Sequence, residues 1–164
     1  MSEPLRYFVS YAHTDRKPTE TLLALLRPRL AIAAGREFQE WTDRDIAPGE
    51  PWREAIDQAL EACDFGLLML SPDFFASRFI TGIELAHFIE TRASGTPNIR
   101  KPIIPVGLIP VPLDGGADLK GLEQIQIFRD RDGRWFDRTR GPTRTDFADQ
   151  LTTAITGRLG GRVA

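Results

Sequence analysis

One uninterrupted apolar run, FGLLML at residues 65–70, constrains the fold of this chain more than any other stretch. The run is short enough for a strand and too uniformly apolar to be exposed on one face. Ser71 and Pro72 follow at once, and these residue types favour the N-cap and the first position of a helix. We therefore expect a central strand of a parallel sheet that turns directly into a helix, at the edge where α/β sheets bind ligands.

Strand and helix signals alternate about five times along the chain. Aromatic, β-branched or apolar runs predict strands at 7–11, 37–41, 65–70, 102–109 and 125–128. Capping residues and apolar periodicity predict helices from Pro18 to Gly35 with a kink or break at Pro28, from Pro51 to Cys63, from Ser71 through Glu84, and from Thr143 or Thr145 to Leu159. Polar connections are expected at 42–51 and 94–101, and a tight turn at 132–133. This order predicts a three-layer α/β fold with a mostly parallel sheet.

The length and charge of the chain narrow the classes of protein to consider. It has 164 residues, the size of one domain, and we expect residues 1–164 to form one. The 21 basic and 23 acidic side chains give a formal charge of −2, so no global field attracts nucleic acid or an anionic membrane. A lone cysteine, Cys63, and the absence of a signal peptide or a membrane-length apolar run predict a cytoplasmic protein.

Glu84 is the acid whose position stands out. At about 100° per residue it shares a helix face with Ile80, Thr81, His87 and Phe88, so its carboxylate lies among apolar neighbours and outside any charged stripe. Such a carboxylate is either a solvated surface acid or part of a site. Spacing alone leaves both interpretations open.

Familiar catalytic motifs do not occur in the sequence. It has no GxxxxGK[ST] phosphate loop, no GxGxxG after its first strand, no GxSxG elbow and no Cys/His metal spacing. A two-component receiver needs an aspartate at the end of its central strand, where this chain has Leu70 and Ser71. The sequence therefore argues against three classes: redox enzymes that use a nicotinamide cofactor, two-component receivers, and proteins with a Cys/His metal site.

Three ordered motifs resemble those of Toll/interleukin-1 receptor (TIR) domains. FVSYAHTD at 8–15 resembles their first box, WTDRDIAPGEPW at 41–52 their BB loop, and SPDFFASRFITGIEL at 71–85 the helix that carries their catalytic glutamate. IQIFRDRDG, which begins at Ile125, is similar to a late strand and turn of bacterial members. The resemblance covers residues 5–159 and implies the flavodoxin-like fold of the family, with about five mostly parallel strands flanked by helices.

The resemblance also implies a site. It places the catalytic glutamate at Glu84, and the substrate cleft between the loop after the first strand, the loop that begins at Asp43 and the start of the Glu84 helix. The substrate-binding residues that it implies are Ser10, Tyr11, Ala12, Asp43, Arg44, Phe79 and Ile80. Ile80 stands where many members have a tryptophan, four residues before the glutamate, so Phe79 is expected to serve in its place.

Residue chemistry leaves structural alternatives open for several of these positions. Tyr11 suits a strand in the core, Ser10 can cap the end of its strand, and Asp43 and Arg44 suit a solvated loop. Trp52 is expected to pack at the start of its helix. We assign no catalytic part to either histidine.

Members of the family either cleave NAD⁺ at the nicotinamide–ribose bond or only assemble with partners. The resemblance implies a bacterial-type NAD⁺ glycohydrolase of cell defence, which takes NAD⁺ as a substrate, uses no cofactor or metal, and releases nicotinamide with linear or cyclic ADP-ribose. Nicotinamide departs neutral, so one ionised carboxylate beside the ribose is enough, unlike the pair that most glycosidases need. A cyclase that signals to a separate effector and a non-catalytic adaptor are the alternatives.

The resemblance further implies partners. It predicts self-association through the BB loop, Thr42 to Pro51, together with a sensor domain or a partner protein. Arginines and aspartates alternate with aromatic residues between Arg129 and Arg144, and this mixed charge favours a self-paired arm or an assembly surface over nucleic-acid binding.

Overall fold

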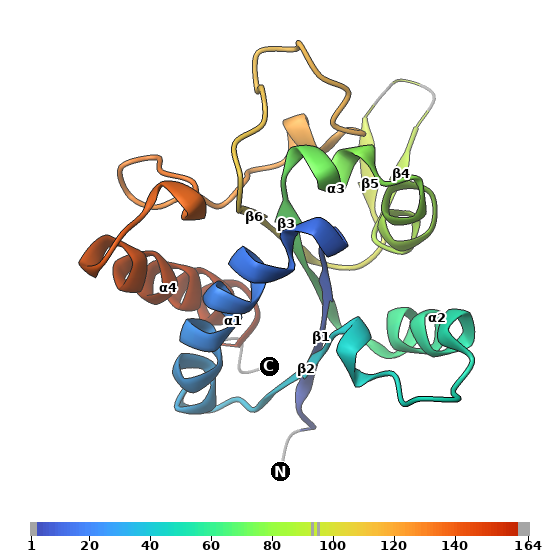
Figure 1. Ribbon diagram of the computed structural model, residues 1–164, viewed down its shortest axis with the longest axis horizontal. Coiled ribbons are helices and arrows are strands. Elements are labelled where there is room, and N and C mark those ends of the chain that lie inside the picture. The colour runs from blue at the N-terminus through green and yellow to red at the C-terminus, as the bar shows by residue number, and fades with distance from the viewer. Residues whose placement is uncertain (1–2, 93, 95, 161–164) are drawn as a thin grey trace.

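Four parallel strands form the central sheet of this protein. The computed structural model describes residues 3–92, 94 and 96–160. The strands are β1 (Leu5–Ser10), β2 (Phe38–Trp41), β3 (Phe65–Leu70) and β6 (Ile103–Gly107), in the spatial order β2-β1-β3-β6 (Figure 1). Ser10 lies opposite Leu68, and Leu70 lies opposite Gly107, so the carboxyl ends of these strands meet at one edge of the sheet. The prediction of a mostly parallel sheet is confirmed.

β3 is the buried centre that the apolar run predicts. All of its residues are buried, because helices cover both faces of the sheet at this strand. Gly66 allows the ring of Phe88 to lie against the strand, since a Cβ at Gly66 would come within 2.8 Å of that ring. At the end of β3, the hydroxyl of Ser71 accepts a 3.0 Å hydrogen bond from the N–H of Phe74, and helix α3 (Pro72–Ala76) begins.

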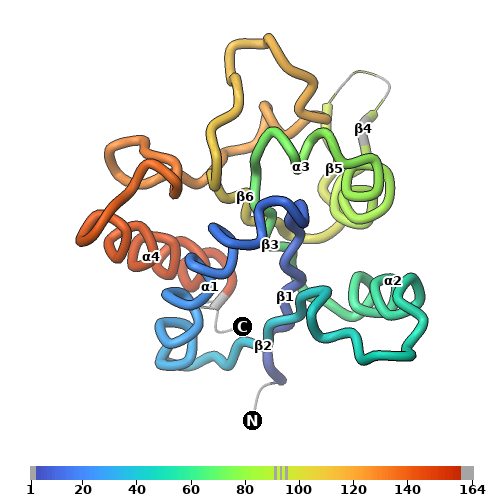
Figure 2. Tube along the Cα trace, viewed as in Figure 1, coloured from blue at the N-terminus to red at the C-terminus, as the bar shows by residue number. Residues whose placement is uncertain are grey.

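Helices cover the two faces of the sheet as separate layers. α1 (Arg16–Ala31) and α4 (Pro142–Ile155) pack together on one face, and α2 (Trp52–Ala62) and α3 lie on the other (Figure 1, Figure 2). The first layer buries Leu22, Leu23, Leu26, Phe147, Leu151 and Ile155 against the sheet. On the other face α2 and α3 bury Ile56, Leu60 and Phe74, and the chain after Glu84 adds Leu85 and Phe88. The two helix layers and the sheet form the predicted three-layer arrangement.

α1 differs from its prediction at both ends and at Pro28. It begins at Arg16, ends at Ala31 and runs through Pro28 without a break. Proline removes one backbone donor, whose acceptor in a regular helix is the carbonyl four residues earlier, here that of Ala24. Both residues lie on the exposed side of α1, where solvent can replace that bond. The buried leucines keep the opposite side packed, so the predicted break does not occur.

The prediction of a single helix from Ser71 through Glu84 is wrong. α3 stops after 5 residues, a π-helical turn follows at Ile80–Glu84, and a 3-10 turn spans Leu85–His87. Ser77 makes the break, because its backbone is extended and its hydroxyl accepts a 3.2 Å hydrogen bond from the N–H of Ile80. Ser77 thus ends one helix and caps the next turn.

A second, antiparallel pair of strands lies outside the central sheet. β4 (Ile89–Thr91) pairs with β5 (Pro97–Ile99) where the sequence predicts the end of a helix and a polar connection. Residues 93 and 95, between the two strands, lie outside the described residues. The local sequence of each segment does not show that the two segments pair, so this hairpin was not predicted.

Two predictions near the C-terminus also need correction. The strand predicted at 125–128 is reduced to one parallel bridge between Phe128 and Val106, because only Phe128 of this described segment exchanges backbone hydrogen bonds with β6, to Pro105 and from Gly107. α4 begins at Pro142 and not at a threonine cap, although it runs in the predicted region. The turn predicted at 132–133 is confirmed, since Gly133 has a φ of 79° and the N–H of Asp130 donates to the carbonyl of Arg134 (3.1 Å).

Candidate active site

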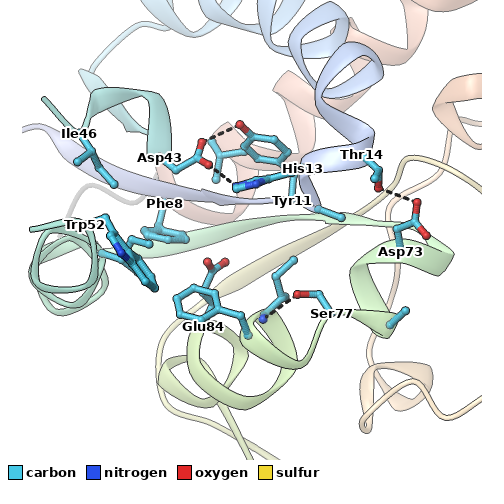
Figure 3. Close-up of a pocket in the computed structure, with 16 residues that line it drawn as sticks. Phe8, Tyr11, His13, Thr14, Asp43, Ile46, Trp52, Asp73, Ser77 and Glu84 are labelled. Atoms are coloured by element: carbon cyan, nitrogen blue, oxygen red, sulfur yellow. Dashed lines mark hydrogen bonds and ion pairs between the residues drawn. The ribbon is translucent and has the colours of Figure 1, made fainter. Parts of the chain in front are cut away.

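Glu84 is a buried carboxylate at the carboxyl end of β1. The residue is 8% exposed, and its Oε1 accepts a 2.6 Å hydrogen bond from the hydroxyl of Ser10, the last residue of β1. Figure 3 shows the carboxylate rising from the π-helical turn beside Phe8 and Trp52. Glu84 is therefore not a solvated surface acid.

Glu84 opens onto a cavity of about 800 Å³, which is within the size range of small-molecule sites. Four separated segments form the cavity: the end of β1 with the turn η1 (His13–Asp15), the turn η2 (Asp43–Asp45), the start of α2, and the chain from α3 to the π-helical turn (Figure 3). Its apolar wall includes Phe8, Ile46, Trp52, Ile56, Phe79 and Ile80. Its polar side chains are Tyr11, His13, Thr14, Asp43, Asp73, Ser77 and Glu84.

Asp43 ties the loop after β2 to the loop after β1. Its Oδ1 accepts a 2.7 Å hydrogen bond from the phenol of Tyr11, and its Oδ2 lies 2.7 Å from Nε2 of His13 (Figure 3). The turn that carries Asp43 is itself fixed by a capping box, in which Thr42 and Asp45 each bond the other's backbone N–H. Burial and the bond to Asp43 raise the pKa of Tyr11 to about 12, so its phenol stays protonated. Asp43 is therefore held in the wall of the cavity.

The surroundings of Glu84 set its ionisation. Burial away from water raises its pKa to about 7, and the negative charge of Asp43 acts in the same direction. The hydrogen bond from Ser10 and the ring of His13 lower the pKa but do not cancel the effect of burial. A carboxyl group of this kind changes its charge near neutral pH, as groups in catalytic sites often do.

A second set of polar contacts anchors the loop after β1 to the start of α3. Ser71 donates a short hydrogen bond to the buried carboxylate of Asp15, and Thr14 donates a 2.7 Å hydrogen bond to Asp73. Burial raises the pKa of Asp15, while the bond from Ser71 opposes that rise. These contacts join the carboxyl ends of β1 and β3, which fixes one side of the cavity.

Aromatic side chains form the mouth of the cavity. Trp52 is 58% exposed, and its ring centroid lies 5.7 Å from that of Phe79. The sequence predicts only packing for Trp52, so this contribution to the cavity was missed. The signal that could have identified it is its position directly after the loop implied to border the cleft.

Most of the residues implied by the sequence lie together at this cavity. Tyr11, Ala12, Asp43, Phe79, Ile80 and Glu84 line it, and Ser10 bonds Glu84. Arg44 does not line the cavity. It is exposed, and its guanidinium pairs with Glu20 at 3.2 Å. The η2 turn sends Asp43 and Arg44 in different directions, which residue types alone do not reveal.

The fold and the site define a flavodoxin-like α/β domain with a buried glutamate in a cavity at the carboxyl edge of its sheet. The sequence profile of the TIR domain family matches residues 8–140. The chain therefore belongs to the TIR domain family.

Two known proteins are similar to parts of this chain. The Uncharacterized protein y4lF of Sinorhizobium fredii is 35% identical over 91 residues, which make up 54% of this chain and 26% of that protein. The crystal structure of the TIR domain of the Toll-related receptor TRR-2 from Hydra magnipapillata matches with a TM-score of 0.51 and 21% identity, over 74% of this chain and 80% of that one. At that identity, the second similarity supports the fold alone.

Other chemical features of the described residues are few. Within 3–92, 94 and 96–160, no helix has the length and apolar character needed to cross a membrane. The same residues contain no group of three or more His, Cys, Asp or Glu side chains arranged to hold a metal ion. Cys63 is buried, its thiol donates to the carbonyl of Leu60 (3.2 Å), and burial raises its pKa to about 11, so it is an unreactive core residue.

Proposed function

We propose that this TIR domain is an NAD⁺ glycohydrolase, which cleaves the bond between nicotinamide and ribose. The observation that carries the proposal is the buried carboxylate of Glu84, held by Ser10 at an aromatic cavity of about 800 Å³. A buried acid without a cationic partner destabilises a fold, and acids of this kind occur most often at functional sites. Ser10 supplies a hydrogen bond to Glu84 but no charge, so a positively charged ligand is the complement that this site lacks.

The proposed reaction suits one carboxylate. When the C–N bond breaks, its electron pair leaves with nicotinamide, whose ring nitrogen becomes neutral, and the ribosyl carbon becomes an oxocarbenium-like cation. Ionised Glu84 stabilises that cation in the transition state, and no general acid is required. Water then adds to the ribosyl carbon and loses a proton, which gives ADP-ribose.

The residues around Glu84 have roles that fit this reaction. Ser10 positions the carboxylate, and Asp43 fixes the loop that borders the cavity through its contacts with Tyr11 and His13. Trp52 and Phe79 present aromatic faces at the mouth, where a planar base can stack. Phe79 serves in place of the tryptophan that many TIR domains have at the position of Ile80.

Two alternatives remain as proposals of lower rank. Capture of the ribosyl cation by the adenine or a ribose of the same substrate would give a cyclic product, and the domain would then act as a cyclase that signals to a separate effector. An adaptor without catalysis would use the exposed tip of the BB loop, residues 47–50, to bind a second TIR domain. The exposure of this tip supports assembly, but it gives no reason for burying Glu84.

The biological setting follows from the family resemblance. We propose a bacterial-type effector of cell defence in the cytoplasm, which self-associates through Thr42 to Pro51 and receives its trigger from a sensor domain or partner protein. The relative in Sinorhizobium fredii is a bacterial protein, which supports the bacterial assignment.

Product analysis tests the proposal. Concentrated protein is incubated with NAD⁺ and a crowding agent, and the products are separated by chromatography. We expect nicotinamide with linear or cyclic ADP-ribose, and we expect Glu84→Gln to slow nicotinamide release by at least about 100-fold. Glu54→Gln, at an exposed acid on α2, is the matched control and should keep the wild-type rate. Wild-type protein that self-associates and leaves NAD⁺ intact would favour the adaptor.

A further inference from the structure

The negative charge of the cavity is unsuited to the pyrophosphate of a dinucleotide. Its lining includes the carboxylates of Asp43, Asp73 and Glu84, and among the described residues that line it there is no lysine or arginine. His13, which lies beside Asp43, is the basic side chain present. This lining favours a positively charged nicotinamide ring and opposes a pyrophosphate.

A second hollow of about 690 Å³ adjoins the cavity and has the opposite charge. The two share Thr14, and the second lies between the start of α1 and the η2 turn. Its walls carry Arg16, Lys17 and Arg44, with Glu20 as the acid among its lining residues. Two sites of opposite charge therefore meet at the loop after β1.

Two of the three cations of this hollow, Arg16 and Lys17, have no ion-pair partner among the described residues. Both residues are exposed. Glu20 is shared between Arg44 at 3.2 Å and Arg27 at 3.4 Å, so its charge is already compensated. The hollow keeps a net positive charge.

Arg16 connects the hollow to the cavity. A hydrogen bond from the Arg16 side chain and its positive charge lower the pKa of Tyr11, against the larger effects of burial and Asp43, so Arg16 lies beside that phenol. Tyr11 and Asp43 form the wall of the cavity on this side. A ligand that passes over this wall moves from a negative to a positive environment.

We propose that the hollow lined by Arg16, Lys17 and Arg44 binds the pyrophosphate of the substrate. The proposal rests on the function proposed above: nicotinamide and its ribose occupy the Glu84 cavity, and the phosphates lie across Thr14 against the cations. Arginine and lysine bind phosphate through charge-assisted hydrogen bonds. The structure thereby assigns Arg44 to the phosphates and not to the cavity.

The other side of the cavity offers a weaker exit. Arg53 lies at the mouth with its guanidinium 5.7 Å from the centroid of Phe79, but it is paired with Asp57 at 3.4 Å. One paired arginine attracts a doubly charged group less than a hollow in which two cations, Arg16 and Lys17, have no ion-pair partner among the described residues. The phosphate position therefore favours the Thr14 side, and Arg53 provides a matched comparison.

Binding of ADP-ribose, which carries the pyrophosphate and is not a glycohydrolase substrate, tests the assignment. We expect calorimetry of the whole chain to show that Lys17→Glu weakens ADP-ribose binding roughly 10-fold or more and that Arg44→Gln weakens it less. Lys17→Arg, which keeps the positive charge, should retain the wild-type affinity. Wild-type affinity should fall as salt is added, and less so in Lys17→Glu. Binding of nicotinamide, which has no phosphate, should not change when followed by NMR.

The controls separate this assignment from the proposed reaction. Arg53→Gln should keep the wild-type affinity for ADP-ribose. Three results would overturn the assignment: a loss in Arg53→Gln as large as in Lys17→Glu, unchanged binding in Lys17→Glu, or no binding of ADP-ribose by the wild type. Wild-type protein that binds ADP-ribose through Lys17 but releases no nicotinamide from NAD⁺ would support the phosphate site and contradict the glycohydrolase.

Discussion

At the scale of single residues, burial of Glu84 lowers the stability of the fold, and we propose that the same carboxylate serves in catalysis. Burial raises its pKa to about 7, and the single hydrogen bond from Ser10 does not restore the ordinary value. Ionised Glu84 is therefore less stable in the folded protein than in water. A residue of this kind links stability to pH in the direction opposite to that of a salt-bridged acid.

This linkage gives a prediction for Glu84→Gln. Below the usual pKa of 4.5 the carboxyl group is protonated in both states, and between 4.5 and about 7 only the unfolded chain loses the proton, so stability falls as pH rises. The accumulated loss is roughly 3 kcal/mol above neutral pH. Glutamine keeps an acceptor for Ser10 without a charge, so urea unfolding should show the variant more stable by about that amount near pH 8. Equal stability of the two proteins at pH 8 would contradict a raised pKa, and near pH 4 the two should agree.

Trp52 is the residue whose part in the site the sequence did not reveal. Its exposed ring beside Phe79 is suited to stacking on a base, and stacking on an aromatic side chain contributes about 1–3 kcal/mol per base. We expect Trp52→Ala to raise KM for NAD⁺ about 10-fold with a smaller effect on kcat, and Trp52→Phe to recover most of the loss. Ile32→Ala, at an apolar residue that is 84% exposed and outside the cavity lining, is the control in steady-state kinetics. An unchanged KM in Trp52→Ala would remove the stacking role.

At the scale of elements, local sequence signals predicted the regular helices and strands well. Features that depend on hydrogen bonds between distant or irregular segments were not predicted. The apolar run of β3 and the amphipathic pattern of α2 place both elements within one residue of their observed bounds. The division of the helix that carries Glu84 depends on the hydroxyl of Ser77, and the β4–β5 pair depends on two short segments meeting. Serine at position 77 is equally compatible with a continuous helix, so the sequence could not announce the break.

The packing of Phe88 on β3 gives a prediction at this scale. A methyl group at Gly66 would lie 2.8 Å from the Phe88 ring, which is fully buried, so Gly66→Ala should lower the free energy of unfolding by about 1–3 kcal/mol. Gly82→Ala is the matched control, because a Cβ there meets nothing within 4 Å and Gly82 lies in the π-helical turn. That variant should be neutral or slightly more stable. Equal losses in the two variants, measured by urea unfolding, would contradict the role of Gly66.

At the scale of the whole molecule, the cavity depends on segments far apart in the sequence. Ser10, Asp43, Trp52 and Glu84 meet because the parallel strands place the ends of β1, β2 and β3 at one edge. The resemblance to TIR domains supplied Glu84 and Asp43. It could not supply the outward direction of Arg44, which the capping box around η2 determines.

The self-association that we propose through the BB loop predicts that activity depends on protein concentration. Specific NAD⁺ cleavage should rise with the concentration of the chain, because assembly by mass action completes the active form. Pro48→Glu, at the exposed loop tip, should lower that activity and flatten its dependence on concentration, with sedimentation velocity reporting assembly. Leu113→Glu, at another exposed loop residue, is the matched control. Activity that is independent of concentration in the wild type would contradict the proposed assembly.

The central claim is that ionised Glu84 stabilises the ribosyl cation as nicotinamide departs. Its most direct test is kcat/KM for nicotinamide release against pH, since this ratio reports the ionisation of the free enzyme. The raised pKa of Glu84 predicts a rate that climbs through about pH 7 and levels off above it, and a Glu84→Gln protein without that climb. A rate that is flat or falls across this range, or a Glu84→Gln protein with the wild-type profile, would contradict the claim.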